Sequence, residues 1–205
     1  MPIEPYYQDD YVVIYLGDCL DILPQLNIDK NALFITDPPY VCKKADWDLE
    51  LPIEQLKYIA SFKNRKLIMP GNLSLIKTGK LFDYTDMIIL HSLNGITKSK
   101  IAFGNYIPVL AIGNWKWEAR PNCLDFIVNT KEEKINHPSP KPLNAIKKLF
   151  RYYVKDEIII DPFMGSGTIL KVAKLLGLKA IGIEIEKKYC DIAIKRLSQE
   201  VLNFG

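Results

Sequence analysis

The tetrapeptide Asp37-Pro38-Pro39-Tyr40 combines residue types that could activate an amine. Two prolines fix the backbone and remove two N–H donors, so neighbouring carbonyl oxygens are left facing outward. The lone pair of an exocyclic base amine is delocalised into its ring. Hydrogen bonds from the amine to Asp37 and to the Pro38 carbonyl would localise that lone pair, while Tyr40 would stack on the base. The same tetrapeptide could also simply end a strand.

A glycine-rich turn lies further along the chain, where residues 161–168 read Asp-Pro-Phe-Met-Gly-Ser-Gly-Thr. Glycines let the backbone approach a ligand closely, and the free N–H groups of the helix that follows can hold an anionic group. The turn lacks the Gly-Lys-Ser/Thr of a phosphate loop. Leu170 stands where the dinucleotide fingerprint has its third glycine. A tight turn that serves packing alone is the alternative.

Glu184 ends the next predicted strand, about twenty residues after the turn, where an acid suits the hydroxyl groups of a ribose. An exposed glutamate without a ligand would fit this position equally well. Together, the glycine turn and the strand-end acid describe a nucleoside site without a pyrophosphate. S-adenosylmethionine is such a ligand.

Short, almost wholly apolar runs predict buried strands at residues 12–16, 32–36, 66–69, 87–90, 109–112, 157–161 and 180–184. Helical spacing occurs at residues 53–61, 142–153, 168–176 and 187–202. This alternation predicts a mostly parallel sheet covered on both faces, with ligands at the carboxyl ends of its strands. Four strands end at or next to an acid: Asp18, Asp37, Asp161 and Glu184. We therefore expect one site.

Composition fits one soluble domain over residues 1–205, with 48% hydrophobic residues and a net charge of +3. The charge favours a polyanionic partner only slightly. The four cysteines are scattered, which favours reduced thiols in a cytoplasm and predicts no metal site. We expect no membrane segment, because no apolar run approaches the roughly 20 residues that a membrane helix needs. The first residues also lack the pattern of a secretion signal.

Three motifs in sequence order carry a family resemblance: residues 37–40, residues 137–142 (His-Pro-Ser-Pro-Lys-Pro) and residues 161–168. The chain resembles the amino-methylating DNA methyltransferases of the β-type motif order, in which the catalytic motif precedes the glycine loop. Residues 16–20 (Leu-Gly-Asp-Cys-Leu) also match that family. The resemblance spans roughly residues 11–48 and 135–200.

The resemblance implies a Rossmann-like S-adenosylmethionine-dependent methyltransferase fold with a circularly permuted motif order. Its sheet would have seven strands and an antiparallel edge hairpin, supplied by the strands that end near residues 90 and 112. The last helix would then lead back to the first strand, bringing the chain ends near one another.

Site residues follow from the same resemblance. The catalytic residues would be Asp37, Pro38, Pro39 and Tyr40. The cofactor-binding residues would be Asp18, Ser139, Lys141, Asp161, Phe163, Gly165, Ser166, Gly167, Thr168 and Glu184. Among these, Phe163, Gly165 and Gly167 would line the methionine part, Glu184 would bind the ribose hydroxyls and Asp18 the adenine edge. Lys141 would pair with the cofactor carboxylate.

The target-recognition segment would be short, about residues 112–136, whereas relatives often carry a longer insert. Specificity would then be low or supplied by a partner, and a homodimer is a further possibility. The candidate DNA contacts are Lys43, Lys44, Trp47, Lys116 and Arg120, with Trp115 and Trp117 beside the last two. A packed loop with surface charges would explain residues 115–120 equally well.

We therefore predict a DNA adenine methyltransferase that moves a methyl group from S-adenosylmethionine to the N6 amine of a flipped base, without a metal. Aspartate rather than serine before Pro-Pro-Tyr favours adenine over cytosine within the resembled family. Methylation of cytosine N4 is the alternative. Methylation of RNA or of a protein glutamine, and a non-catalytic DNA- or cofactor-binding remnant, are the rivals.

Overall fold

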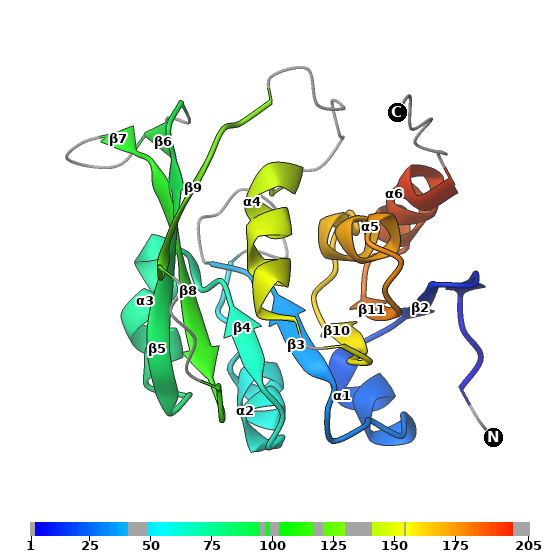
Figure 1. Cartoon of the computed structure of the whole chain (residues 1–205). Helices are drawn as coiled ribbons and strands as arrows, with labels where there is room; N and C mark the ends of the chain where they lie inside the picture. The colour runs from blue at the N-terminus through cyan, green and yellow to red at the C-terminus, as the bar shows by residue number, and fades with distance from the viewer. Residues whose placement is uncertain are drawn as a thin grey trace.

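A mixed sheet with helices on both faces forms the fold (Figure 1), which confirms the predicted α/β class. The computed structural model describes residues 3–40, 49–94, 97–98, 103–116, 121–129, 141–153 and 155–198. Among these residues, no helix combines the length and the apolar composition that crossing a membrane requires.

The main sheet has nine strands, in the spatial order β1 (Tyr7–Gln8), β2 (Val12–Leu16), β11 (Ala180–Glu184), β10 (Ile159–Asp161), β3 (Leu33–Thr36), β4 (Lys66–Ile68), β8 (Tyr106–Ile112), β5 (Tyr84–Ser92) and β9 (Cys123–Phe126). The five strands from β2 to β4 run parallel. β8 is antiparallel to both β4 and β5, and β9 is parallel to β5. Strands β6 (Thr97–Lys98) and β7 (Phe103–Gly104) form a separate pair.

The predicted count of seven strands is wrong for this chain, because β1 and β9 add one strand at each edge. The predicted antiparallel hairpin is present as β5 and β8, but β9 lies outside it. β9 falls within the segment assigned to target recognition. Its side chains alternate between exposed and buried, from Cys123 to Phe126. A search for wholly apolar runs overlooks such a half-exposed strand.

The helices are α1 (Cys19–Ile22), η1 (Leu23–Gln25), α2 (Ile53–Ser61), α3 (Gly71–Gly79), α4 (Leu143–Leu149), η3 (Phe150–Tyr152), α5 (Thr168–Leu175) and α6 (Lys187–Ser198). Buried side chains of α4, α5 and α6 form one core cluster with one face of the sheet. Those of α1 and α2 form a second cluster with the other face. The buried residues of β10, β11 and β3 divide between these two clusters, as expected for strands covered on both sides.

The sequence does not predict α3, because its polarity is reversed. Ser74 and Thr78 are buried, while Leu73 and Ile76 are 67% and 75% exposed. An amphipathic helix normally turns its apolar stripe towards the core, and the periodicity argument depends on that stripe. Burial of apolar side chains does not explain why the polar face of α3 points inward, so a specific polar contact must contribute to this orientation.

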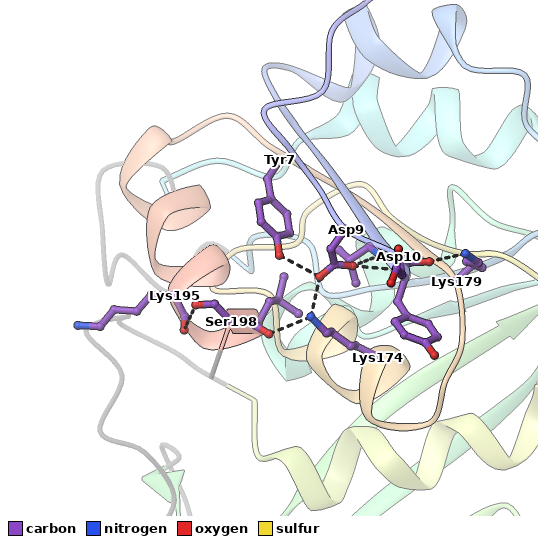
Figure 2. A network of polar contacts seen from close by, with 10 residues as sticks. Tyr7, Asp9, Asp10, Lys174, Lys179, Lys195 and Ser198 are labelled. Atoms are coloured by element: carbon purple, nitrogen blue, oxygen red, sulfur yellow. Dashed lines mark hydrogen bonds and ion pairs between the residues drawn. The ribbon is translucent and has the colours of Figure 1, made fainter. Parts of the chain in front are cut away.

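The last helix returns to the first strands, as predicted from the motif order. Lys174 Nζ of α5 donates hydrogen bonds to Asp9 Oδ2 at 2.6 Å and to the Leu197 carbonyl at 3.0 Å (Figure 2). Tyr6 Oη donates to Asp191 Oδ1 of α6 at 2.7 Å. These contacts join the β1–β2 turn to α5 and Tyr6 to α6, so the last helix lies beside the first strands of the sheet.

Gly167 is the N-cap residue of α5 and has a left-handed backbone, with φ of +75°. A Cβ atom there would lie 2.8 Å from the Cβ of Ala193. We expect Gly167→Ala to lower the free energy of unfolding by about 2–4 kcal/mol, since backbone strain adds to overpacking against α6. Gly177→Ala is the matched control, because Gly177 has φ of +70° but no atom within 4 Å of its added Cβ. Urea unfolding compares them, and equal losses would contradict the packing role.

Candidate active site

A cavity of about 270 Å³ lies at the carboxyl ends of the parallel strands. Residues 37–40, which follow β3, line one part of it, and residues 161–166, which begin at the last residue of β10, line another. Asp18, Lys141, Thr168 and Glu184 complete the predicted residues in its wall. The two motifs predicted to carry the chemistry therefore share one cavity, although they are far apart in the sequence.

The pairing of β3 with β10 brings the two motifs together. Thr36, the last residue of β3, donates from Oγ1 to Asp161 Oδ1 at 2.6 Å, and both residues are buried. This bond links the residue before the tetrapeptide to the first residue of the glycine turn. Sequence reasoning did not single out Thr36. The available signal was a hydroxyl at the end of an otherwise apolar strand.

Asp161 is 1% exposed, and this burial raises the pKa of its carboxyl to about 8. The hydrogen bonds from Thr36 and from the Phe163 N–H act in the opposite direction, because they stabilise the charged form. Desolvation prevails over both. Burial therefore favours the protonated form of this carboxyl, and a cation placed beside it would favour its ionisation.

Asp161→Asn should change how stability depends on pH. The folded-state pKa of about 8 lies above the ordinary 3.8, so the folded protein binds more protons than the unfolded chain between those values. The free energy of unfolding therefore falls as pH rises through this window, by about 1.4 kcal/mol for each pH unit. Asparagine does not titrate, and its amide oxygen can still accept from Thr36.

The measurement for Asp161→Asn is urea unfolding of the ligand-free protein at pH 5 and pH 8. We expect the variant to be more stable than wild type by a few kcal/mol at pH 8. It should keep only the smaller decline due to Glu184, whose pKa burial also raises. Parallel pH profiles for variant and wild type would contradict this account.

Glu184 joins the end of β11 to the glycine turn. Its Oε2 accepts the Gly165 N–H at 2.9 Å, and its Oε1 accepts the Glu186 N–H at 2.8 Å. Burial raises the pKa of this carboxyl, while these backbone hydrogen bonds lower it. A carboxylate has about four lone-pair sites, so acceptor capacity towards the cavity exceeds what these two bonds use.

Asp18 is held by two donors at the end of β2. Its Oδ1 caps α1 by accepting the Leu20 N–H at 2.9 Å. Its Oδ2 accepts from Gln55 Nε2 of α2 at 3.0 Å, and Gln55 also lines the cavity. Sequence reasoning missed Gln55, since nothing in the spacing of α2 marks a site residue.

Asp37, Tyr40 and Lys141 form a polar cluster in the wall of the cavity. The Tyr40 hydroxyl donates to Asp37 Oδ1, and Lys141 Nζ donates to Asp37 Oδ2 and to the Tyr40 oxygen. Lys141 Nζ also lies 4.6 Å from the centroid of the Tyr40 ring. The sequence assigned Lys141 to a cofactor carboxylate. The structure places its ammonium beside Asp37, because a charge-assisted bond to this carboxylate is within its reach.

Arg196 supports the glycine turn from behind, and sequence reasoning missed it. This α6 residue is buried and donates to the Ser166 carbonyl. It also donates to the hydroxyls of Ser166 and Thr168, each at 3.2 Å. The only sequence signal was an arginine on the inward face of the last helix.

The structure does not bring every predicted residue to this cavity. Gly167 is not in its wall and packs against Ala193 instead. Lys116 lines a second cavity of about 880 Å³ with Arg65 and Trp115. This cavity lies at the amino ends of the parallel strands, whereas the first lies at their carboxyl ends. Because β8 runs antiparallel to β4, residues that follow it emerge at the amino ends of the parallel strands. The remaining predicted residues lie outside the described part of the chain: Lys43, Lys44, Trp47, Trp117, Arg120, His137 and Ser139.

A family model for N6- and N4-type enzymes, described as DNA methylase, matches residues 114–195. The chain is 47% identical to the type II methyltransferase M2.LlaDCHI of Lactococcus lactis subsp. cremoris over 256 residues, covering 96% of this chain and 93% of that relative. The chain belongs to the amino-methylating DNA methyltransferases. The alignment spans 256 positions, whereas this chain has 205 residues. M2.LlaDCHI therefore carries segments that this chain lacks.

A second relative and two solved structures resemble the chain less closely. The type II methyltransferase M1.MboII of Moraxella bovis is 26% identical over 255 residues, covering 93% of this chain and 98% of that relative. A crystal structure of an M1.HpyAVI–SAM complex superposes with a TM-score of 0.72 at 24% identity, covering 91% of this chain and 99% of that one. The cytosine-N4-specific PvuII DNA methyltransferase superposes with a TM-score of 0.70 at 18% identity, covering 98% and 90% of the two chains. These likenesses establish the fold and leave the target base open.

Proposed function

We propose that this family member transfers a methyl group from S-adenosylmethionine to the exocyclic N6 amine of an adenine displaced from DNA. The observation that carries the proposal is the single cavity lined by both residues 37–40 and the glycine turn. An amine held by the tetrapeptide would face a nucleoside held by the turn. Methyl transfer requires this arrangement, because the attacking atom and the methyl carbon must lie in line at close range.

The residues around the glycine turn fit S-adenosylmethionine. Glu184 has acceptor capacity for ribose hydroxyls, and Asp18 is held rigidly enough by Leu20 and Gln55 to read a base edge. Asp161 supplies a buried carboxyl that a cationic ligand would ionise. The bound cofactor supplies a methyl group on a sulfonium, which is a good leaving group. We also assign Phe163, Gly165, Ser166 and Thr168, which line the cavity, to cofactor binding. Ser139 is assigned to the same role.

The tetrapeptide would hold the target amine. Asp37 and the Pro38 carbonyl would accept its two N–H groups and favour a pyramidal nitrogen with a localised lone pair. Tyr40 would stack on the displaced base, whose unstacking costs a few kcal/mol. The base must replace the contact between the Tyr40 hydroxyl and Asp37, while Lys141 offsets the charge of Asp37 throughout. Positioning and oriented polar groups then account for catalysis without a covalent intermediate.

The choice of adenine rests on Asp37 at the first position of the tetrapeptide. The test is to incubate plasmid DNA with the protein and S-adenosylmethionine, digest it to nucleosides and identify the modified base by mass spectrometry. We expect N6-methyladenine. N4-methylcytosine would replace the proposed base with the alternative, and the absence of any modified base would favour a non-catalytic remnant.

We also infer that the motif order is circularly permuted relative to methyltransferases whose glycine loop comes first. The position of β10 and β11 supports this inference: they come last in the sequence but lie between β2 and β3 in the sheet. The contact of α6 with β2 and with Tyr6 supports it further.

DNA contacts by Lys43, Lys44, Trp47 and Arg120 stay predictions. Lys116 is a weaker candidate, because it lies at the opposite edge of the sheet from the cavity. The residues that this chain lacks relative to M2.LlaDCHI support low intrinsic specificity or a partner that supplies it.

A further inference from the structure

The amino end of α3 contacts Tyr40 at two points that the motifs do not include. Gly71 lies against the ring side of Tyr40, and Ser74 reaches its backbone. Neither residue lines the cavity, so neither touches a bound base directly. Any effect they have on the reaction must pass through Tyr40.

Gly71 leaves room for the Tyr40 side chain. A Cβ atom at Gly71 would lie 2.7 Å from Tyr40 Cδ1, 2.8 Å from Cγ and 3.2 Å from Cβ. Real Cβ atoms do not come this close to a ring, so any side chain at position 71 must push Tyr40 away. The backbone of Gly71 also has φ of +64°, which favours glycine on its own account. The contact with Tyr40 is a second, independent requirement.

Ser74 fixes the main chain of Tyr40. Its Oγ donates to the Tyr40 carbonyl at 2.6 Å, and the residue is only 2% exposed. This bond explains why α3 turns the polar Ser74 inward although the apolar Leu73 beside it is then left 67% exposed. Folding alone would favour the opposite orientation of the helix.

Strand pairing sets this contact. Thr36 of β3 lies opposite Ile68 of β4 in the parallel register, and the Met69 N–H donates to the Thr36 carbonyl at 2.9 Å. The chain segments that leave the two strands therefore start side by side. The hydrogen bonds that pair β3 with β4 therefore also bring residues 70–74 next to residues 37–40.

We propose that Gly71 and Ser74 are positioning residues that set the ring of Tyr40 for capture of the displaced base. This proposal rests on the proposed function, which gives Tyr40 its stacking role. The Tyr40 carbonyl accepts a hydrogen bond from Ser74, and the Cβ, Cγ and Cδ1 atoms of Tyr40 pack against Gly71. The Tyr40 hydroxyl oxygen accepts a hydrogen bond from Lys141. A ring restrained in this way is already oriented before the base arrives. Less conformational entropy is therefore lost when the base binds.

The first test is single-turnover methyl transfer by Gly71→Ala. We expect the rate to fall about tenfold, with cofactor affinity unchanged by calorimetry, since a displacement of about 1 Å can cost more than this. Fluorescence of 2-aminopurine at the target position should show less base displacement. Gly177→Ala is the control: it imposes similar backbone strain at φ of +70° with no neighbouring atom, and its rate should match wild type.

The second test is a double-mutant cycle with Tyr40→Ala, which measures whether Gly71 acts through Tyr40. In that background Gly71→Ala should lower the residual rate no further. Ser74→Ala, which removes a donor without adding bulk, should lower the wild-type rate about threefold and also lose its effect in the Tyr40→Ala background. It keeps the test available if Gly71→Ala folds poorly.

Each outcome is decisive. Equal losses with and without the Tyr40 ring, or an equal loss in Gly177→Ala, would overturn the positioning role. Wild-type protein that methylates DNA while both α3 variants keep its rate would reject this inference alone. Wild-type protein without any methyl transfer would reject the proposed function, and the role of Tyr40 with it.

Discussion

Replacing Asp37 with alanine is expected to lower the rate of methyl transfer by about 100- to 1,000-fold, which is the usual effect of removing one oriented polar group at a reacting atom. Asp37 lies in the cavity wall directly after β3, and it is the carboxylate of the tetrapeptide that we propose to be catalytic. Without it, the amine loses the acceptor that localises its lone pair. The rate is measured with radiolabelled S-adenosylmethionine in a single turnover.

Cofactor binding should stay nearly intact in Asp37→Ala, because the glycine turn and Glu184 are untouched. Calorimetry checks this separation of binding from chemistry. Asp21→Ala is a matched control, since Asp21 is exposed on α1 and does not line the cavity. Unchanged turnover in Asp37→Ala would remove this residue from the mechanism.

Replacing Glu184 with alanine should weaken cofactor binding by about 10- to 100-fold. A hydrogen bond to a charged group contributes about 1.5–3 kcal/mol, and each 1.4 kcal/mol is tenfold in affinity. The substitution removes the proposed ribose acceptor. It also releases the Gly165 N–H and the Glu186 N–H, so the turn itself loses an anchor.

Glu186→Ala is the control for this experiment. Glu186 lies two residues further, outside the cavity wall, and its side chain pairs with Lys188. Its removal should leave the affinity within about twofold of wild type. Equal affinity of wild type and Glu184→Ala in calorimetry would show that the nucleoside assignment is wrong.

The sequence predicted the parallel centre of the sheet because β2, β3, β10 and β11 are covered on both faces and are therefore almost wholly apolar before their last residues. An acid at or just after each strand end is then sufficient to place four carboxyl groups at one edge, since parallel strands end together. For this reason the site could be located from the sequence before its geometry was known.

Strand β9 and helix α3 were not predicted. β9 alternates in burial, and α3 turns Ser74 inward and Leu73 outward, so neither shows the periodicity of a buried element. Lys116, a candidate DNA contact, lies at the amino ends of the parallel strands, away from the cavity. The direction of β8 decides at which edge Lys116 emerges, and no local signal in the sequence gives that direction.

Residues that support the site from a distance escaped prediction for a related reason. Arg196 contacts Ser166 from 30 positions away, and Thr36 contacts Asp161 across 125 positions. Their roles exist only once the strands and helices are assembled. A motif shows which residues could contact a ligand, whereas tertiary structure shows which residues hold them in place.

The most direct measurement is a crystal structure with an unreactive analogue of S-adenosylmethionine that carries an amine in place of the methyl sulfonium. We expect its ribose hydroxyls to bind Glu184 and its amine to point towards Asp37 across the cavity of about 270 Å³. A nucleoside bound in the second cavity beside Trp115, or a reactive end turned away from Asp37, would contradict the account.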